Sequence, residues 1–212
     1  MRFNLTLGII AVCAAMHVAV VIGIGLLGIS PEIVLEHLAF SGRNLYSKPY
    51  TLLTSIFLHI NVDHLLSNLL VFLFFGTALE REIGRARMLI IFLAGGIAGN
   101  LVSLLFYGYD AYFLGASGAV FAIIGAGMLI TPLDISLYPY FFPIPLGVLG
   151  ILYAVYNTLG FFYGTESISY VGHFAGMLIG CAYGLKYTGV KRGLLIIVIM
   201  SAILLLPLLI FL

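Results

Sequence analysis

The chain has 212 residues, of which 63% are hydrophobic and 8% charged, and its mean hydropathy is +1.21. Soluble domains carry about 25% charged residues, so water is not the main solvent of this protein. A net charge of +1, no basic run and two cysteines also exclude a disordered chain, a nucleic-acid-binding protein and a disulfide-stapled secreted domain.

Apolar segments long enough to cross a bilayer recur along the whole chain. About 20 apolar residues span the hydrocarbon core as a helix. The sequence therefore predicts an all-α polytopic membrane protein, one domain over residues 1–212, built from a six-helix core at about 8–187 and a seventh C-terminal span. The predicted spans are 8–28, 58–79, 88–107, 114–130, 144–163, 168–187 and 193–212.

The first two regions of the chain need separate interpretation. The apolar run at 8–28 follows Arg2 as in a signal peptide, but it exceeds the usual core of 7 to 15 residues, so we expect a retained helix. The stretch from 29 to 57 mixes charged residues and prolines with apolar ones. It is too polar to span and too apolar for a free linker, so we expect an interfacial, partly helical loop.

The distribution of Lys and Arg predicts the orientation in the membrane, because positively charged loops stay cytoplasmic. With the N-terminus inside, only Arg43 and Lys48 lie outside. The cytoplasmic side then holds Arg2, Arg81, Arg85, Arg87, Lys186, Lys191 and Arg192. The second, fourth and sixth spans all run from outside to inside in this arrangement.

Four polar residues lie near the outer start of those three spans: His64, Asn68, Ser117 and His173. Polar groups within a span cost free energy unless they face a partner or a wet cavity, so four at one depth indicate a common site. His64 and Asn68 are four residues apart and share a helix face. Considered alone, they are equally consistent with hydrogen bonds that hold helices together.

Ser117 lies in Gly115-Ala116-Ser117-Gly118, where an outer loop turns into the fourth span. Flanking glycines let other atoms approach the hydroxyl, and the first N–H groups of a helix are free to donate to an anion. By itself this motif is more typical of helix packing than of a nucleophile.

His173 lies beside the first of a series of glycines spaced by four residues. This spacing predicts that one face of the sixth span packs tightly against a neighbouring helix. The series is Gly172, Gly176, Gly180 and Gly184. Close approach of the helices would also bring the His173 imidazole within hydrogen-bonding reach of Ser117, as a nucleophile and its base require.

A third catalytic member is not expected. The nearest acidic candidates, Asp63, Asp110 and Glu166, fall at the outer interface rather than within the spans, so the sequence predicts a Ser-His dyad. Phe121, one turn after Ser117, is a candidate for a ring that packs on His173, although a lipid-facing or core position is equally consistent with the sequence.

A metal site or another cofactor is not expected. His59 and His64 are five residues apart, which is not a metal-ligand spacing, and no HExxH or CxxC motif occurs. Cys13 and Cys181 are single residues within spans and are interpreted as packing residues.

Taken together, three motifs resemble the rhomboid family of intramembrane serine proteases over about residues 45–187. They are His64-x-x-x-Asn68, Gly115-Ala116-Ser117-Gly118 and Gly172-His173-x-x-Gly176, each in the matching span. The resemblance implies a six-helix core whose site opens toward the outer face, and a fifth span that moves to admit transmembrane protein substrates.

Residue by residue, the resemblance implies that Ser117 is the nucleophile and His173 the general base. His64, Asn68 and the backbone N–H of Ser117 would form the oxyanion hole. The sequence departs from the family pattern where a Trp-Arg pair in the first loop is replaced by Tyr50-Thr51. Phe121 stands where the family often has Tyr, and Gly172 stands where it often has Ala.

Two other functions remain open from the sequence. An inactive rhomboid-like protein that binds membrane clients would share the fold, but such proteins typically lose the serine or the histidine, and both are present. A small-molecule transporter would be expected to show two similar halves, and no clear internal repeat is found.

Overall fold

The structure, a computed structural model, describes residues 4–136, 143–164 and 168–210. Within these ranges the chain is helical apart from one two-stranded antiparallel hairpin, which confirms the all-α class. The elements are α1 (Leu5–Gly25), α2 (Pro31–Leu38), α3 (Asn44–Ser47), α4 (Thr51–Phe57), α5 (Val62–Ile83), α6 (Arg85–Tyr107), α7 (Ser117–Ile130), β1 (Ile135–Ser136), β2 (Ile144–Pro145), α8 (Leu146–Tyr163), α9 (Tyr170–Thr188) and α10 (Val190–Ile210).

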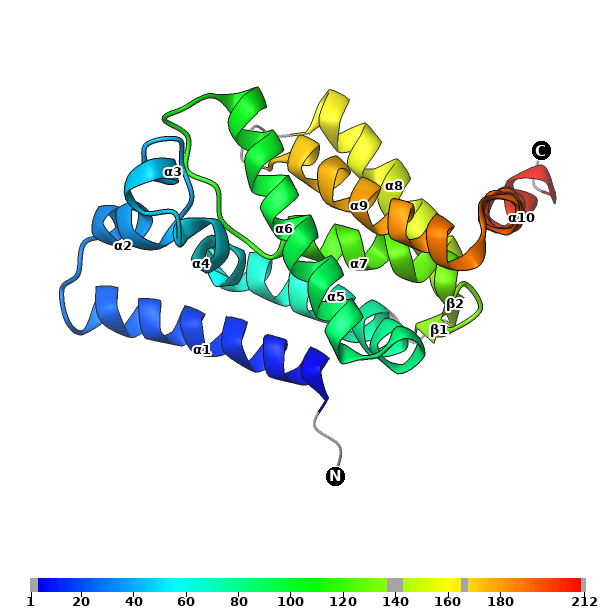
Figure 1. Cartoon of the computed structure of the whole chain (residues 1–212), viewed down its shortest axis with the longest axis horizontal. Coiled ribbons are helices and arrows are strands. Elements are labelled where there is room, and N and C mark those ends of the chain that lie inside the picture. The colour runs from blue at the N-terminus through cyan, green and yellow to red at the C-terminus, as the bar shows by residue number, and fades with distance from the viewer. Residues whose placement is uncertain (1–3, 137–142, 165–167, 211–212) are drawn as a thin grey trace.

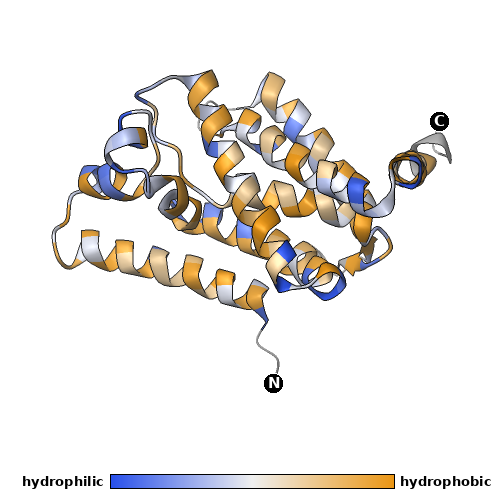
Figure 2. Cartoon of the chain, viewed as in Figure 1, coloured by the Kyte–Doolittle hydropathy of each residue, from blue (hydrophilic) through white to orange (hydrophobic). Residues whose placement is uncertain are grey.

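Four of the described helices, α1, α5, α6 and α8, are each long and apolar enough to cross a membrane. The pair α9 and α10 meets the same test together, but the two helices bend by 117° at Gly189 (Figure 1). A helix thus occupies the predicted seventh span, at a steep angle to α9, and whether it crosses the membrane by itself stays a prediction. Figure 2 shows that hydrophobic residues occur along the length of these helices.

Helix α5 begins four residues later than the sequence predicts because Asn61 caps it. The Asn61 side chain accepts a hydrogen bond from the His64 N–H at 2.8 Å, so the helix starts at Val62. His64 therefore lies in the first turn of α5 and Asn68 one turn later on the same face.

Helix α7 lies at the centre of the molecule and is only 14 residues long. Every residue from Ala119 to Leu129 is buried, and α5, α6, α8 and α9 all contact it (Figure 1). A helix enclosed by other helices does not need to match the thickness of the hydrocarbon, which explains its shortness.

Glycines allow α9 and α7 to approach closely. A Cβ at Gly176 would overlap the carbonyl oxygen of Gly118, and one at Gly180 would overlap that of Ala122. At the N-terminal end of α9, a Cβ at Gly172 would lie 2.5 Å from the Ser103 hydroxyl of α6. The glycine series therefore faces α7 and α6, and a side chain larger than hydrogen would separate the helices that carry Ser117 and His173.

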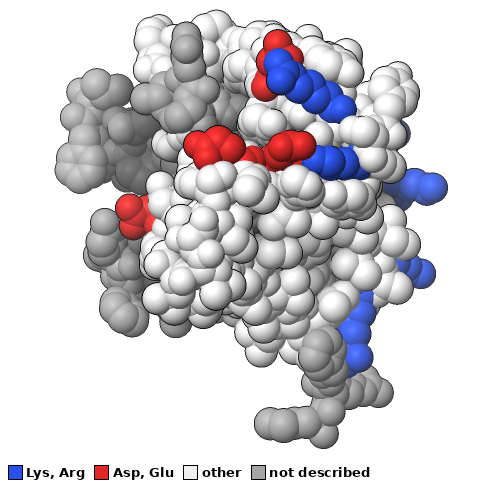
Figure 3. Space-filling model, turned by 90° about the vertical axis from the view of Figure 1, so that its left-hand side faces the viewer, with Lys and Arg blue, Asp and Glu red and all other residues white. Residues whose placement is uncertain are grey.

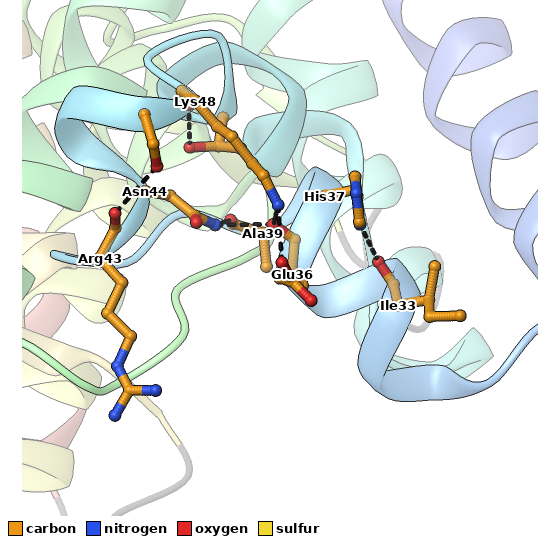
Figure 4. A network of polar contacts seen from close by, with 9 residues as sticks. Ile33, Glu36, His37, Ala39, Arg43, Asn44 and Lys48 are labelled. Carbon is orange, nitrogen blue, oxygen red and sulfur yellow. Dashed lines mark hydrogen bonds and ion pairs between the residues drawn. The ribbon is translucent and has the colours of Figure 1, made fainter.

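The segment from 29 to 57 folds into α2, α3 and α4, in agreement with the expected partly helical loop. Figure 4 shows its internal polar network. The Asn44 amide donates to the carbonyl oxygens of Glu36 and Ala39 at 2.9 and 3.1 Å, and the Lys48 ammonium binds the Glu36 carboxylate at 2.9 Å. The hydrogen bond and charge of Lys48 hold the pKa of Glu36 below its usual range.

This loop is also attached to the rest of the molecule. Phe40 pairs with Phe113 through two backbone hydrogen bonds of 2.9 and 2.7 Å, and Arg43 forms an ion pair with Asp110 at 2.7 Å. Figure 3 shows acidic and basic side chains side by side at this end, on a surface that is otherwise largely uncharged. These contacts anchor the loop although Tyr50-Thr51 stands where the family often has Trp-Arg.

Candidate active site

Ser117 is the first residue of α7, at the end of an extended segment that leaves the Phe40–Phe113 bridge. Gly115 makes the turn into the helix with φ +117°, which L side chains rarely adopt. The N–H groups of the first turn of α7 have no intrahelical partner. Ser117 therefore combines a half-buried hydroxyl with free backbone donors beside it.

The His173 imidazole lies directly beside the Ser117 hydroxyl. Its Nε2 is 2.8 Å from Ser117 Oγ, and the histidine is 8% exposed. His173 comes from the first turn of α9, whose Gly176 lies against Gly118 one residue after the serine. The structure thus brings together two residues that are 56 positions apart in the sequence, at the distance required for proton transfer.

The other ring nitrogen of His173 is occupied by Asn157 of α8. Asn157 Oδ1 lies 2.9 Å from His173 Nδ1, and the asparagine is fully buried. Its amide nitrogen donates to the carbonyl oxygen of Tyr170 at 3.1 Å. The sequence interpretation missed this residue, although a lone Asn within an apolar span is the kind of polar group that drew attention to the other four.

Phe121 covers one face of the imidazole. The two rings are stacked, with centroids 4.4 Å apart and planes inclined by 9°. The ring of Tyr153 of α8 lies nearly perpendicular to that of Phe121, with the two centroids 6.1 Å apart. Phe121 is also buried in the hydrophobic core, so the core position and the position against His173, which the sequence offered as alternatives, are the same one here.

The His64 ring lies against the turn that precedes Ser117. A Cβ on Gly115 would be 2.6 Å from His64 Cε1, so the ring lies against that glycine. Asn68 is buried one turn further along α5 and donates to the His64 carbonyl oxygen at 2.8 Å. His64 therefore borders the Ser117 turn from the α5 side, and the Asn68 side chain is bonded to the backbone of the same helix.

His59 also contacts the turn that precedes Ser117. Its Nε2 accepts a hydrogen bond from the Ala116 N–H at 3.4 Å, and its Nδ1–H donates to the Phe57 carbonyl at 3.3 Å. The His59 carbonyl in turn accepts from His17 Nδ1–H at 3.2 Å. His59 is thus a structural neighbour of the serine turn rather than a second base.

No carboxylate contacts His173 in the described ranges. Asp110 is paired with Arg43, whereas Glu166 lies outside the described residues. The described chain also contains no group of three or more His, Cys, Asp or Glu side chains arranged to hold a metal ion. The groups that the described residues bring together around His173 are a hydroxyl, an imidazole and an amide.

Known proteins are similar to about two thirds of this chain. A family model described as Rhomboid domain matches residues 46–190. The rhomboid protease GluP of Bacillus subtilis is 35% identical over 146 residues, which cover 66% of this chain and 27% of that protein. RHOMBOID-like protein 12, mitochondrial, of Arabidopsis thaliana is 31% identical over 161 residues, 68% of this chain and 47% of that protein.

The chain spans less than half the length of these relatives. The matched domain nevertheless covers most of this chain and includes α5, α7 and α9, which carry the residues described above. The chain is therefore an integral multi-pass membrane protein that belongs to the rhomboid family.

Proposed function

We propose that this protein is an intramembrane serine endopeptidase that cleaves transmembrane helices of membrane proteins near the outer face of the bilayer. The observation that carries the proposal is the 2.8 Å separation of His173 Nε2 and Ser117 Oγ. Two further findings support it: the motifs around Ser117 and His173 resemble the rhomboid pattern, and one relative is named as a rhomboid protease. No cofactor is required.

In the proposed mechanism, Ser117 Oγ attacks the scissile carbonyl carbon while its proton passes to His173 Nε2. The resulting imidazolium then protonates the departing amine, which leaves an acyl-enzyme on the serine. A water molecule, deprotonated by the same nitrogen, releases the second product and restores the hydroxyl. Water must therefore reach the site, which requires a hydrated opening between the helices at the outer face.

The oxyanion formed in the first step would be stabilised by the backbone N–H of Ser117 and the side chains of His64 and Asn68. Ser117 N–H belongs to the free first turn of α7, and the Asn68 amide has a second N–H besides the one donated to the His64 carbonyl. Loss of one such donor costs other hydrolases about 10² to 10³ in kcat. Asn68→Ala is expected to slow cleavage by about 10² or more, and an unchanged rate would remove Asn68 from this role.

The decisive experiment is cleavage of a tagged transmembrane segment by the purified protein, together with labelling by a serine-directed fluorophosphonate. Ser117→Ala should abolish both while the protein remains folded and elutes as wild type. Ser201→Ala is a matched control, because Ser201 is also half-buried but lies in α10, which carries none of the site residues. Full cleavage by Ser117→Ala would refute the mechanism.

A protein that binds membrane clients without cleaving them would give a different result. It would retain transmembrane segments in pull-down experiments, with no product and no fluorophosphonate labelling of the wild type. A transporter would likewise show no labelling.

A further inference from the structure

Helix α8 is weakly buried except at two places. Its first turns, Leu146 to Gly150, pack against the molecule, and beyond them Asn157 is the only buried residue between Ile151 and Tyr163. Asn157 is 0% exposed. A buried amide must satisfy its donors and acceptor within the protein, so its partners show why it is there.

Those partners fix which way the amide points. The Tyr170 backbone carbonyl can only accept a hydrogen bond, so the Asn157 atom 3.1 Å away is the NH₂ group. The oxygen, Oδ1, then faces His173 Nδ1 at 2.9 Å. Because that oxygen can only accept, Nδ1 must carry the proton, and the neutral ring presents a bare Nε2 to the Ser117 hydroxyl.

We infer that Asn157 is a positioning residue for the proteolytic reaction: by accepting the Nδ1 proton of His173, it holds the imidazole in the tautomer and orientation in which Nε2 can take the Ser117 proton. This inference rests on the proposed function. Asn157 does not touch the reacting atoms and acts only through His173. It takes the place that a buried carboxylate has in a Ser-His-Asp triad, without adding a charge to a membrane interior.

The contact also makes the imidazole depend on where α8 lies. Both partners of Asn157, Tyr170 and His173, are in the first turn of α9. The opposite end of α8 is held separately, since Gly147 lies against Met200 of α10 and Gly150 against Met128 of α7. Displacement of the Asn157 end of α8 from α9 would therefore release Nδ1 and leave the tautomer unspecified.

The tautomer can be measured directly. In the full-length protein labelled with ¹⁵N-histidine in detergent micelles, His173 is expected to show a protonated Nδ1 and an unprotonated Nε2 at pH 7.5, assigned by the signals lost in His173→Ala. In Asn157→Leu, which is similar in size but lacks polar atoms, a signal from the Nε2–H form should appear. A structural role alone would not change the tautomer.

Kinetics give the second test. Asn157→Leu is expected to lower kcat about tenfold or more, the rate equivalent of one lost hydrogen bond. KM should stay within about twofold, because a side chain that is 0% exposed offers no surface to a substrate. Thr158→Val is the control, since this neighbouring side chain of α8 is exposed and its hydroxyl donates to the Ala154 carbonyl of the same helix. If Asn157→Leu does not fold, Asn157→Ala is used for the same two measurements.

Two results would overturn the inference: an Nε2–H tautomer in the active wild type, or wild-type kcat in a folded Asn157 variant. Either would leave the protease function intact. Failure of the protease function would look different, because the wild type would neither cleave nor be labelled by fluorophosphonate while the His173 tautomer remained measurable.

Discussion

The imidazole of His173 is held from three directions by side chains of three residues. Ser117 lies at one ring nitrogen, Asn157 at the other, and Phe121 on the ring face at 4.4 Å. A Tyr is frequent at the Phe121 position in the family that this chain resembles, but stacking requires only the ring. The hydroxyl that Phe lacks is therefore not required to hold the imidazole in plane.

Gly115 has both a backbone conformation that favours glycine and a direct contact with His64 of the site. Gly115→Ala combines a strained φ of +117° with a clash between the new Cβ and the His64 ring. We expect a loss of stability of about 1–3 kcal/mol from the strain and a large loss of cleavage activity from the displaced His64. The measurements are thermal unfolding in detergent and cleavage of the tagged segment.

Gly108→Ala separates these two effects. Gly108 has a similar φ of +94°, but nothing lies within 4 Å of its missing Cβ. This variant should lose comparable stability and keep its activity. Equal activity in both variants would show that contact between His64 and the serine turn does not matter.

At the scale of elements, the contact between α7 and α9 decides whether the site exists. The carbonyl oxygens of Gly118 and Ala122 occupy the space where side chains of Gly176 and Gly180 would lie. Because peptide groups cannot move aside as a flexible side chain does, even one methyl group must push the helices apart.

Gly176→Ala is therefore expected to destabilise the protein by about 1–3 kcal/mol and to reduce fluorophosphonate labelling of Ser117. Gly25→Ala, at the end of α1 with nothing within 4 Å of its Cβ, should change neither. Melting temperatures and labelling rates of the two variants test this. Normal labelling in a destabilised Gly176→Ala would mean that Ser117 and His173 tolerate separation of their helices.

At the scale of the whole molecule, a carboxylate of α5 helps to join α1 to the core, alongside the buried Ile9 and Cys13 of α1. Glu80, near the end of α5, accepts hydrogen bonds from Leu5 N–H, Thr6 N–H and the Thr6 hydroxyl at 2.9, 2.8 and 2.7 Å. These are free donors at the start of a helix, where negative charge is favourable.

Glu80→Leu should thus destabilise the attachment of α1 by about 1–3 kcal/mol. Limited proteolysis is expected to cut between α1 and α2 sooner than in wild type. Glu82→Leu, two residues later on the exposed side of α5, serves as the control. Identical proteolysis of the two variants would contradict an anchoring role for Glu80.

The orientation predicted from Lys and Arg concerns the entire chain. With Cys13 and Cys181 replaced by Ala, single cysteines at Asp110 and Arg87, both exposed, should react from opposite sides of the membrane. A membrane-impermeant maleimide added to intact cells is expected to label the Asp110→Cys protein alone. Labelling of Arg87→Cys instead would invert the orientation.

The sequence by itself determined that the chain is helical and membrane-embedded, because 63% of its residues are hydrophobic and they recur in runs of about 20, the length of a membrane-spanning helix. It also pointed to His64, Asn68, Ser117 and His173, since polar residues in apolar spans are costly and stand out. It placed the start of α5 four residues early, because hydropathy does not register the Asn61 cap.

Only the tertiary structure decided which side chains meet. Asn157 and His173 are 16 residues apart on different helices, and no periodicity relates them. The 117° bend between α9 and α10 could not be predicted from the sequence either, because an apolar run gives the length of a helix but not its direction. Contacts between helices depend on packing in three dimensions, whereas the cost of placing a residue in the membrane depends on that residue alone.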